Sequence, residues 1–402
     1  MKQEGINRRE FVIKSAVGLV AAGVGLHPAR TRGAEEKKPS RIVYRTLGRT
    51  KLRIPLVSFG AMNSDSPDLI HRALDLGVNH LDTAHVYLRG KSEKAIGKIL
   101  EERGCRDEVY VATKMLFNRD KEKRVFVDRG RGKYAGATAE NFEKQLAKSF
   151  KRLRSDYVDI LYLHSCLGAE MVTYEPMLKQ FVKAKEAGQT RFIGVSTHSN
   201  EPETIRAAVD AGVWDVILTS YNFLQDHRGE VKEAIQYATN RGLGVIAMKT
   251  QGGVRLNREK KVEVNHAAAL KWVLQDDCVC TTIPGITTFD QLHLDLGVMS
   301  NLDLSDEEQR DLEISSLVRG HLYCQQCRQC IPSCSRHVEI PTFMRAYMYV
   351  AGYGNLHEAR STVAGVPPER GLSRCGDCPS CTARCRNGIE IRERLESLRA
   401  MG

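Results

Sequence analysis

A regular alternation of two kinds of segment runs from Ile54 to Met299 and constrains the fold of the 402-residue chain more than any other feature. Short runs rich in β-branched residues alternate with longer runs whose apolar residues recur at helical spacing. The short runs predict strands at 54–61, 80–84, 109–114, 158–164, 191–197, 215–221, 244–249 and 280–285. A predicted helix follows each of them, at 68–77, 92–104, 139–153, 175–188, 201–212, 229–242, 266–275 and 289–297.

Eight strands that are each followed by a helix over about 250 residues are typical of a (β/α)₈ TIM barrel. We therefore expect an α/β fold, with the barrel over residues 42–303. An open doubly wound sheet is the alternative, but no GxGxxG motif follows the first predicted strand. The polar runs around Gly48, at 44–53, predict a hairpin that plugs one end of the barrel. The basic connection 118–138 is expected to form a solvated lid, and a clamp for an anionic group is the other interpretation.

Eight of the twelve cysteines fall in two runs that repeat the pattern C-x₂-C-x₂-C-x₃-C. The first run is Cys324, Cys327, Cys330 and Cys334, and the second is Cys375, Cys378, Cys381 and Cys385. Three thiols at successive three-residue steps suit one iron–sulfur cube, whereas structural zinc sites usually present pairs of ligands separated by a longer loop. We expect two [4Fe–4S] clusters, with zinc and disulfides as alternatives. The other four cysteines lie in apolar segments and are expected to be small core residues.

The cysteine pattern resembles that of two-cluster ferredoxins, in which the fourth cysteine of each run ligates the other cluster. The segments 340–360 and 389–400 have helical periodicity, and Ser305 with Glu308 forms a capping-box pattern at the start of a further helix. Residues 304–402 are therefore expected to form a small, mainly α-helical ferredoxin-like domain.

The first 34 residues resemble a twin-arginine export signal. Arg8 and Arg9 precede Phe11 and an apolar run at 15–26, which is short for a membrane span. An ordinary amphipathic helix is the alternative, although the run has no polar face after Ser15. Because Arg32 stands where a cleavage site prefers a small residue, the signal is expected to be cleaved poorly. The expected location is therefore the periplasm, with a membrane tether wherever the signal stays in place.

The formal net charge of +11 gives little reason to expect a nucleic-acid partner. Residues 1–34 contain six basic and two acidic residues and so contribute +4 to this net charge. Two ligated clusters, each about −2 in its oxidised form, would lower the charge of the remaining chain further.

Polar residues mark the ends of three consecutive predicted strands. Asp82 ends the second strand and Tyr87 follows it, Lys114 ends the third, and His164 ends the fourth. Such groups converge at the mouth of a barrel. An ammonium beside a tyrosine lowers the phenol pKa, so Lys114 is expected to activate Tyr87 as a proton donor. Asp82 would orient Lys114, and His164 would hydrogen-bond a carbonyl oxygen. Taken singly, each residue also fits a structural role.

Several segments, including "HLDTAHVYLRGKSEKAIGKIL", "YVDILYLHS" and "TIPGITTFDQL", resemble the aldo-keto reductase family in order and spacing over residues 42–300. The resemblance implies a catalytic tetrad of Asp82, Tyr87, Lys114 and His164, with Tyr87 as the general acid-base. It also implies a nicotinamide cofactor that lies across the barrel mouth. The implied substrate is a small carbonyl compound or alcohol.

The positions implied for the nicotinamide cofactor depart from the family's pattern. Ser196-Thr197-His198 stands where the family has Ser-Asn, and Leu218 stands where it has Gln. Met248-Lys249 replaces an aromatic residue that stacks on the nicotinamide. The basic residues that grip a 2′-phosphate are missing near the eighth strand. The remaining candidates there are Gly285, Thr287, Gln291 and Asp295.

We expect an oxidoreductase that interconverts a carbonyl and an alcohol while the clusters relay electrons to a redox partner. NAD, NADP and a different electron carrier all stay open, and a nicotinamide that is used would be tightly bound. One difficulty is that a nicotinamide transfers two electrons together, whereas a [4Fe–4S] cluster passes one at a time. The alternative is an electron-transfer or binding protein whose barrel is a docking scaffold. A further alternative is that the clusters are only structural staples.

Overall fold

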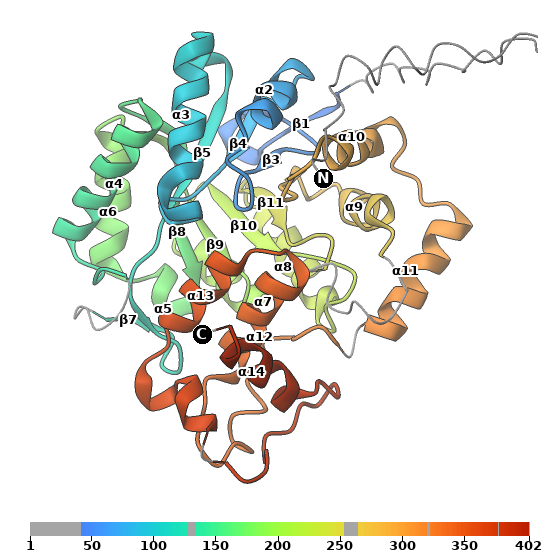
Figure 1. Cartoon of the computed structure of the whole chain (residues 1–402). Coiled ribbons are helices and arrows are strands. Elements are labelled where there is room, and N and C mark those ends of the chain that lie inside the picture. Colours follow the sequence, from blue (N-terminus) through green and yellow to red (C-terminus); the bar gives the residue numbers. More distant parts are fainter. Residues whose placement is uncertain (1–41, 128–133, 253–263, 320–321, 377, 402) are drawn as a thin grey trace, which may run out of the picture. The chain divides into compact units, whose positions relative to one another are not determined.

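The computed structural model describes residues 42–127, 134–252, 264–319, 322–376 and 378–401. Residues 1–34, with the expected export signal, lie outside this part of the chain. Eight parallel strands form the central sheet in their order along the chain (Figure 1). They are β3 (Phe59–Gly60), β4 (His80–Asp82), β5 (Tyr110–Met115), β8 (Val158–Cys166), β9 (Thr190–Thr197), β10 (Val216–Ser220), β11 (Gly244–Met248) and β12 (Thr281–Thr282).

The first and last strands meet and close the sheet into a barrel. Parallel bridges join Val57 to Thr282 and Gly60 to Gly285. The backbone N–H of Ser58 also donates to the carbonyl oxygen of Thr282 at 2.8 Å. Closure removes both sheet edges, so the expected (β/α)₈ architecture is confirmed.

Helices surround the barrel and bury their apolar sides against the strands. They are α2 (Pro67–Asp75), α3 (Lys91–Arg103), α4 (Ala139–Leu153), α6 (Glu175–Glu186), α7 (Glu201–Asp210), α8 (Arg228–Thr239), α9 (His266–Leu274) and α10 (Phe289–Gly297), with the short α5 (Ala169–Val172) after β8. In α4, Phe142, Leu146 and Leu153 are buried, and the Thr138 side chain caps the first turn. The helical periodicity of the sequence therefore predicted the outer layer correctly.

The predicted hairpin at 44–53 is present and closes one end of the barrel. Strands β1 (Tyr44–Thr46) and β2 (Arg53–Pro55) pair in antiparallel fashion. Leu47 and Ile54 are fully buried and pack into the barrel interior. Gly48 permits this close approach, because a Cβ atom there would lie 2.4 Å from the backbone nitrogen of Gly244.

Residues after 304 are mainly helical, as expected, and no strand occurs in the portion of 304–402 that the structure describes. Helix α11 (Asp306–Arg319) begins with the predicted capping box, in which Ser305 and Glu308 exchange backbone-to-side-chain hydrogen bonds at 2.9 and 3.2 Å. It is followed by α12 (Ile340–Tyr347), the π-helix η6 (Met348–Gly352), α13 (Leu356–Ala364) and α14 (Ile391–Arg399). Helices α12, η6, α13 and α14 share a core of their own that includes Val338, Phe343 and Leu395.

The barrel and the C-terminal helices belong to one compact unit, residues 39–402. Arg345 of α12 donates to the Ser199 hydroxyl at 3.0 Å, and Asn355 donates to Asn63 at 2.8 Å. Both barrel residues follow strands at their carboxyl ends, so α12 and η6 cover part of the barrel mouth (Figure 1).

The connection 118–138 contains a small hairpin, β6 (Arg119–Asp120) and β7 (Val125–Phe126). Lys121 of this hairpin donates to the Thr342 hydroxyl of α12 at 2.9 Å. The guanidinium nitrogens Nε and Nη1 of Arg119 are fully buried. The expectation of a solvated lid is therefore wrong for these residues, because the C-terminal helices pack onto them. No helix in the described ranges is long and apolar enough to cross a membrane.

Candidate functional site

The four candidate catalytic residues lie at the carboxyl ends of neighbouring barrel strands. Asp82 ends β4, Lys114 lies near the end of β5, and His164 lies in β8. Tyr87 begins the short helix η2 (Tyr87–Gly90) that follows β4. Parallel strands in register bring these ends together, since Asp82 pairs with Ala112 and Lys114 pairs with Tyr162.

Lys114 and Asp82 form a buried ion pair. The Lys114 ammonium donates to the Asp82 carboxylate and also, at 2.7 Å, to the backbone carbonyl of Thr83. Both side chains are 1% exposed. Burial lowers the pKa of Lys114 and raises that of Asp82, and the attraction within the pair opposes both shifts. The pair therefore fixes the position of the ammonium.

Tyr87 packs between this ion pair and His164. The Lys114 Nζ lies 5.0 Å from the centre of the Tyr87 ring. The His164 ring meets Tyr87 edge-on, with 5.9 Å between ring centres. The structure thus brings all four residues of the sequence-predicted tetrad together around one phenol.

The pKa of Tyr87 moves opposite to the direction expected from the sequence. Burial raises its pKa well above the usual value, and the Asp82 carboxylate raises it further. The expectation that Lys114 would lower it overlooked the loss of solvent around the phenol. Burial also lowers the pKa of His164 well below its usual value, assisted by the Lys114 charge. At neutral pH the site therefore offers a protonated phenol and a neutral imidazole.

The eight clustered cysteines line two separate cavities. Cys324, Cys327, Cys330 and Cys385 line an open cavity of about 400 Å³, which we call the first cradle. Cys334, Cys375, Cys378 and Cys381 line a second of about 620 Å³, which we call the second cradle. In each cradle three thiols come from one run and the fourth from the other.

The cradles suit a bulky cluster better than a single ion or a disulfide. All twelve cysteines are free thiols. In the described ranges no three His, Cys, Asp or Glu side chains lie close enough to share one metal ion. The thiols instead surround a space, as the sulfur ligands of a cube do. Hydrogen-bond donors accompany them: Gln326 Nε2 lies 3.2 Å from the Cys324 sulfur, and the N–H of Asn387 lies 3.4 Å from that of Cys385.

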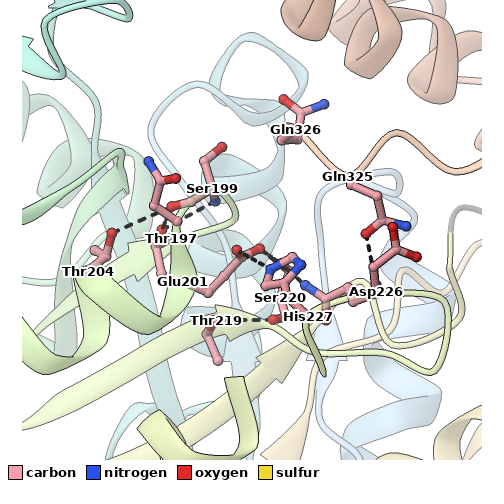
Figure 2. Close-up of polar contacts among 12 residues, drawn as sticks. Thr197, Ser199, Glu201, Thr204, Thr219, Ser220, Asp226, His227, Gln325 and Gln326 are labelled. Carbon is pink, nitrogen blue, oxygen red and sulfur yellow. Dashed lines mark hydrogen bonds and ion pairs between the residues drawn. The ribbon is translucent and has the colours of Figure 1, made fainter. Parts of the chain in front are cut away.

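The first cradle adjoins the barrel mouth. Cys324 also lines a pocket together with Lys249 and His198, which follow β11 and β9, and with Arg345 of α12. The neighbouring Gln325 accepts from the backbone N–H of Asp226 at 3.1 Å (Figure 2). Beside this contact Figure 2 shows the buried Glu201, which accepts from Ser220.

Comparison with known proteins identifies both parts of the chain. A model of the aldo/keto reductase family matches residues 58–265, more than half of the sequence. The chain belongs to the aldo/keto reductase family. A model of a 4Fe-4S dicluster domain matches residues 323–390. This aldo/keto reductase is therefore an oxidoreductase with an iron–sulfur domain.

Its relatives cover about two thirds of the chain. L-glyceraldehyde 3-phosphate reductase of Escherichia coli K12 is 27% identical over an alignment of 338 residues, and the match covers 68% of this chain and 92% of that protein. L-galactose dehydrogenase of Arabidopsis thaliana is 27% identical over 310 residues, with 68% and 93% covered. The holo form of aldo-keto reductase AKR11C1 from Bacillus halodurans matches with a TM-score of 0.55 and 23% identity, covering 68% of this chain and 96% of that one. That last likeness supports the fold alone.

In this aldo/keto reductase the side chains at the nicotinamide end of the site do not fit a carboxamide. Ser196 and Thr197 are fully buried, and Ser196 Oγ already accepts the N–H of Ser165 at 2.8 Å. Thr197 Oγ1 lies 2.9 Å from two backbone carbonyls. Leu218 is fully buried in the barrel interior and offers no hydrogen bond.

A cation occupies the position where an aromatic residue stacks on the nicotinamide. Lys249 follows β11 with a left-handed backbone, φ 56°. Its Nζ lies 5.9 Å from the centre of the Tyr349 ring, which belongs to η6. The neighbouring Met248 packs against the barrel interior. Lys249 therefore offers an amine where the family has an aromatic face for the nicotinamide ring.

The four candidates near β12 lie apart from the tetrad or are engaged with other residues. A Cβ atom on Gly285 would lie 3.0 Å from Asn63 Nδ2. Thr287 donates to Gln291 through both its N–H and its hydroxyl, at 2.8 and 2.9 Å. Asp295 is buried and accepts from Gln251 at 3.1 Å. A buried carboxylate there disfavours a 2′-phosphate.

The fold adds to the site four residues that the sequence did not predict: Arg119, Ser165, Arg345 and Tyr349. Ser165 has a left-handed backbone, φ 63°, at the end of β8, as Lys249 has at the end of β11. Such strain in non-glycine residues clusters at functional sites. The basic character of 118–138 was a signal for Arg119. For Arg345 and Tyr349 the sequence held none, because they arrive through the packing of α12 and η6.

Proposed function

We propose that this chain interconverts a carbonyl and an alcohol at Tyr87, and that the electrons pass between the substrate and two [4Fe–4S] clusters without a nicotinamide. The observation that carries this proposal is the position of Cys324. It belongs to the first cradle and lines the same pocket as Lys249, which stands at the nicotinamide position of the family. One thiol of the first cradle thus lies beside the place from which a hydride would otherwise come.

Reduction of a carbonyl to an alcohol takes up two electrons and two protons, and in this proposal Tyr87 supplies the proton that binds oxygen while water at the barrel mouth supplies the proton that binds carbon. Bound clusters would supply the electrons one at a time. Tyr87 holds a proton for the carbonyl oxygen, and its raised pKa keeps it protonated at neutral pH. His164 donates a hydrogen bond to the same oxygen. The Lys114 ammonium, which Asp82 holds 5.0 Å from the centre of the Tyr87 ring, would offset part of the charge of the phenolate left when the proton is transferred.

The second cradle is the proposed exit toward an external redox partner. Its four thiols line it together with Glu396, which pairs with Arg392 at 2.8 Å, and with three guanidinium groups that outnumber this carboxylate, those of Arg336, Arg392 and Arg399. These side chains would place positive charge around the second cluster, which favours an acidic electron carrier. Electrons would then pass between the substrate and the carrier through the two cradles, in whichever direction the reaction runs.

We further propose that residues 1–34 direct export by the twin-arginine route and that residues 42–303 and 304–402 form the two domains. Export of a folded protein would keep the eight thiols ligated in an oxidising compartment. Poor cleavage would leave the chain tethered to the membrane. The periplasm also holds no free nicotinamide pool, which agrees with a cluster-linked reaction.

The Tyr87→Phe variant tests the proposal. Loss of the proton donor is expected to lower dye-linked turnover of carbonyl compounds by about 10²–10⁴-fold. Tyr162→Phe is the matched control, because the Tyr162 hydroxyl is buried beside Lys114 and has no hydrogen-bond partner among the described residues. Equal turnover in both variants would contradict the assignment of Tyr87.

A further inference from the structure

Three basic side chains gather between the barrel mouth and α12, and no carboxylate of the described residues lies within ion-pair distance of them, although the charges of Glu201 and Glu358 raise the pKa of Lys249. The three are Arg119 of β6, Lys249 after β11 and Arg345 of α12, and none of them forms an ion pair in the described part of the chain. Burial lowers the pKa of Lys249 well below its usual value, and Arg345 lowers it further. Burial also lowers the pKa of Arg119, and the Arg345 charge lowers it further, while Tyr134 raises it.

Two of the side chains here carry buried donors with nothing to bind. Arg119 Nε and Nη1 and His198 Nδ1 are inaccessible to solvent and have no hydrogen-bond partner among the described residues. Arg119 uses only Nη2, which donates to the Ser165 hydroxyl at 3.2 Å, and this hydroxyl lies 3.1 Å from His198 Nε2. Leaving a guanidinium buried and unpaired is costly. An anion that accepts from it would remove the cost.

Lys121 of the same hairpin is also buried without an ion pair among the described residues and donates to the Thr342 hydroxyl at 2.9 Å, whereas two buried cations elsewhere in the barrel are paired. Lys114 pairs with Asp82, and Arg152 pairs with Glu93 at 3.0 Å. The unpaired cations are therefore a local feature and not the general pattern of this barrel.

The cations lie beside the tetrad. The Tyr349 ring is 5.9 Å from Lys249 Nζ. Tyr349 is among the groups whose charge raises the pKa of Tyr87. Lys249 and Arg119 are among those whose charge lowers the pKa of His164. A small substrate whose carbonyl contacts Tyr87 and His164 therefore places its other end among the cations.

We infer that the substrate is a small carbonyl compound or alcohol that carries an anionic group, a carboxylate or a phosphate, bound by Arg119, Lys249 and Arg345. This inference rests on the proposed function. It also explains the unpaired nitrogens of Arg119 better than charge balance with the first cluster does. Cys324 is among the groups whose charge raises the pKa of Lys249. It is not among the groups whose charge most strongly affects the pKa of Arg119.

Calorimetric titration of the cluster-loaded protein with malonate and with inorganic phosphate tests the inference. We expect binding by the unmodified protein, and about tenfold to hundredfold weaker binding by Arg119→Gln and by Arg345→Gln, since each removes a charge-assisted hydrogen bond. Arg124→Gln is the matched control, because Arg124 lies on the same hairpin connection but pairs with Glu203 at the surface. It should bind both anions as the unmodified protein does. Tighter binding of malonate would identify a carboxylate, and tighter binding of phosphate a phosphate.

The inference is overturned if the unmodified protein binds neither anion, or if Arg119→Gln and Arg345→Gln bind them as well as Arg124→Gln does. A shift of the cluster reduction potential in Arg119→Gln with unchanged anion binding would overturn it too, because the cations would then serve the cluster. Failure of the proposed function looks different. In that case anion binding would still depend on Arg119, while Tyr87→Phe would leave turnover unchanged.

Discussion

The thiol of Cys385 lines the same cavity as the thiol of Cys324, although the two belong to different runs of the cysteine repeat. Cys334 crosses in the other direction and joins Cys375. Each of these fourth cysteines therefore ties the two runs together, and both lie close to the core shared by α12 and α14.

This crossing predicts the iron content of cysteine variants. Cys385→Ser should lose about four of about eight iron atoms. Adding Cys324→Ser should remove no more, because both thiols serve the first cradle, whereas adding Cys375→Ser should remove the rest. Iron and sulfide analysis of anaerobically purified protein measures this. Cys278→Ser, outside both cradles, should keep all its iron. Greater loss with Cys324→Ser than with Cys375→Ser would show that the runs do not cross.

The buried pair of Lys114 and Asp82 predicts a stability effect that can be separated from catalysis. Asp82→Asn leaves the ammonium buried without its counter-charge, so the free energy of unfolding should fall by about 3–5 kcal/mol. The double variant Asp82→Asn with Lys114→Met should regain much of that stability and remain inactive. Urea unfolding and turnover measure the two effects. A double variant no more stable than the single one would contradict the ion pair as the cause.

The buried Asp295 predicts a pH-dependent stability. Burial raises its pKa from 3.8 to about 7. A raised folded-state pKa means that the protonated form stabilises the fold fully below pH 3.8, and that this contribution is lost as pH rises through about 7. Asp295→Asn should therefore match the unmodified protein at pH 4 and exceed its free energy of unfolding at pH 8 by about 1–4 kcal/mol. Thermal unfolding at the two pH values measures this. If the free energies of unfolding of the two proteins differed by the same amount at both pH values, Asp295 would not be the group that titrates.

The ion pairs of Glu339 are expected to help hold the iron–sulfur helices to the barrel. The buried Glu339 carboxylate accepts from Arg328 at 2.7 Å and pairs with Arg370 at 3.0 Å, and Arg370 also pairs with Glu122 of the barrel connection. Glu339→Gln should lower the free energy of unfolding by about 2–4 kcal/mol, because it leaves two guanidinium groups poorly paired. It should also speed proteolysis after residue 304. The exposed Glu369→Gln is the control, and equal proteolysis of both variants would show that Glu339 has no such role.

The sequence predicted the elements well where periodicity and spacing determine them. The eight strands, their helices and the Ser305 cap follow from local patterns, and the spacing of Cys324 to Cys334 indicated a cluster before any cavity was visible. The convergence of Asp82, Tyr87, Lys114 and His164 followed from their positions at strand ends.

Burial and long-range packing set what could not be predicted. The raised pKa of Tyr87 depends on the solvent that the covering helices exclude. Arg345 and Tyr349 reach the site only because α12 and η6 fold back over the barrel mouth. In place of the solvated lid expected at 118–138, Lys121 of this connection meets Thr342 of α12 across that packing.

The measurement that tests the account most directly is the reoxidation of the clusters by a carbonyl compound. Nucleotide-free, cluster-loaded protein is reduced anaerobically and mixed with a panel of anionic and neutral aldehydes and ketones, while the visible absorbance and the alcohol formed are followed. We predict that the clusters reoxidise without NADH or NADPH, with one alcohol formed for every two electrons, and that Tyr87→Phe slows both. Alcohol formation that consumes NADH or NADPH while the cluster absorbance stays unchanged would contradict the account.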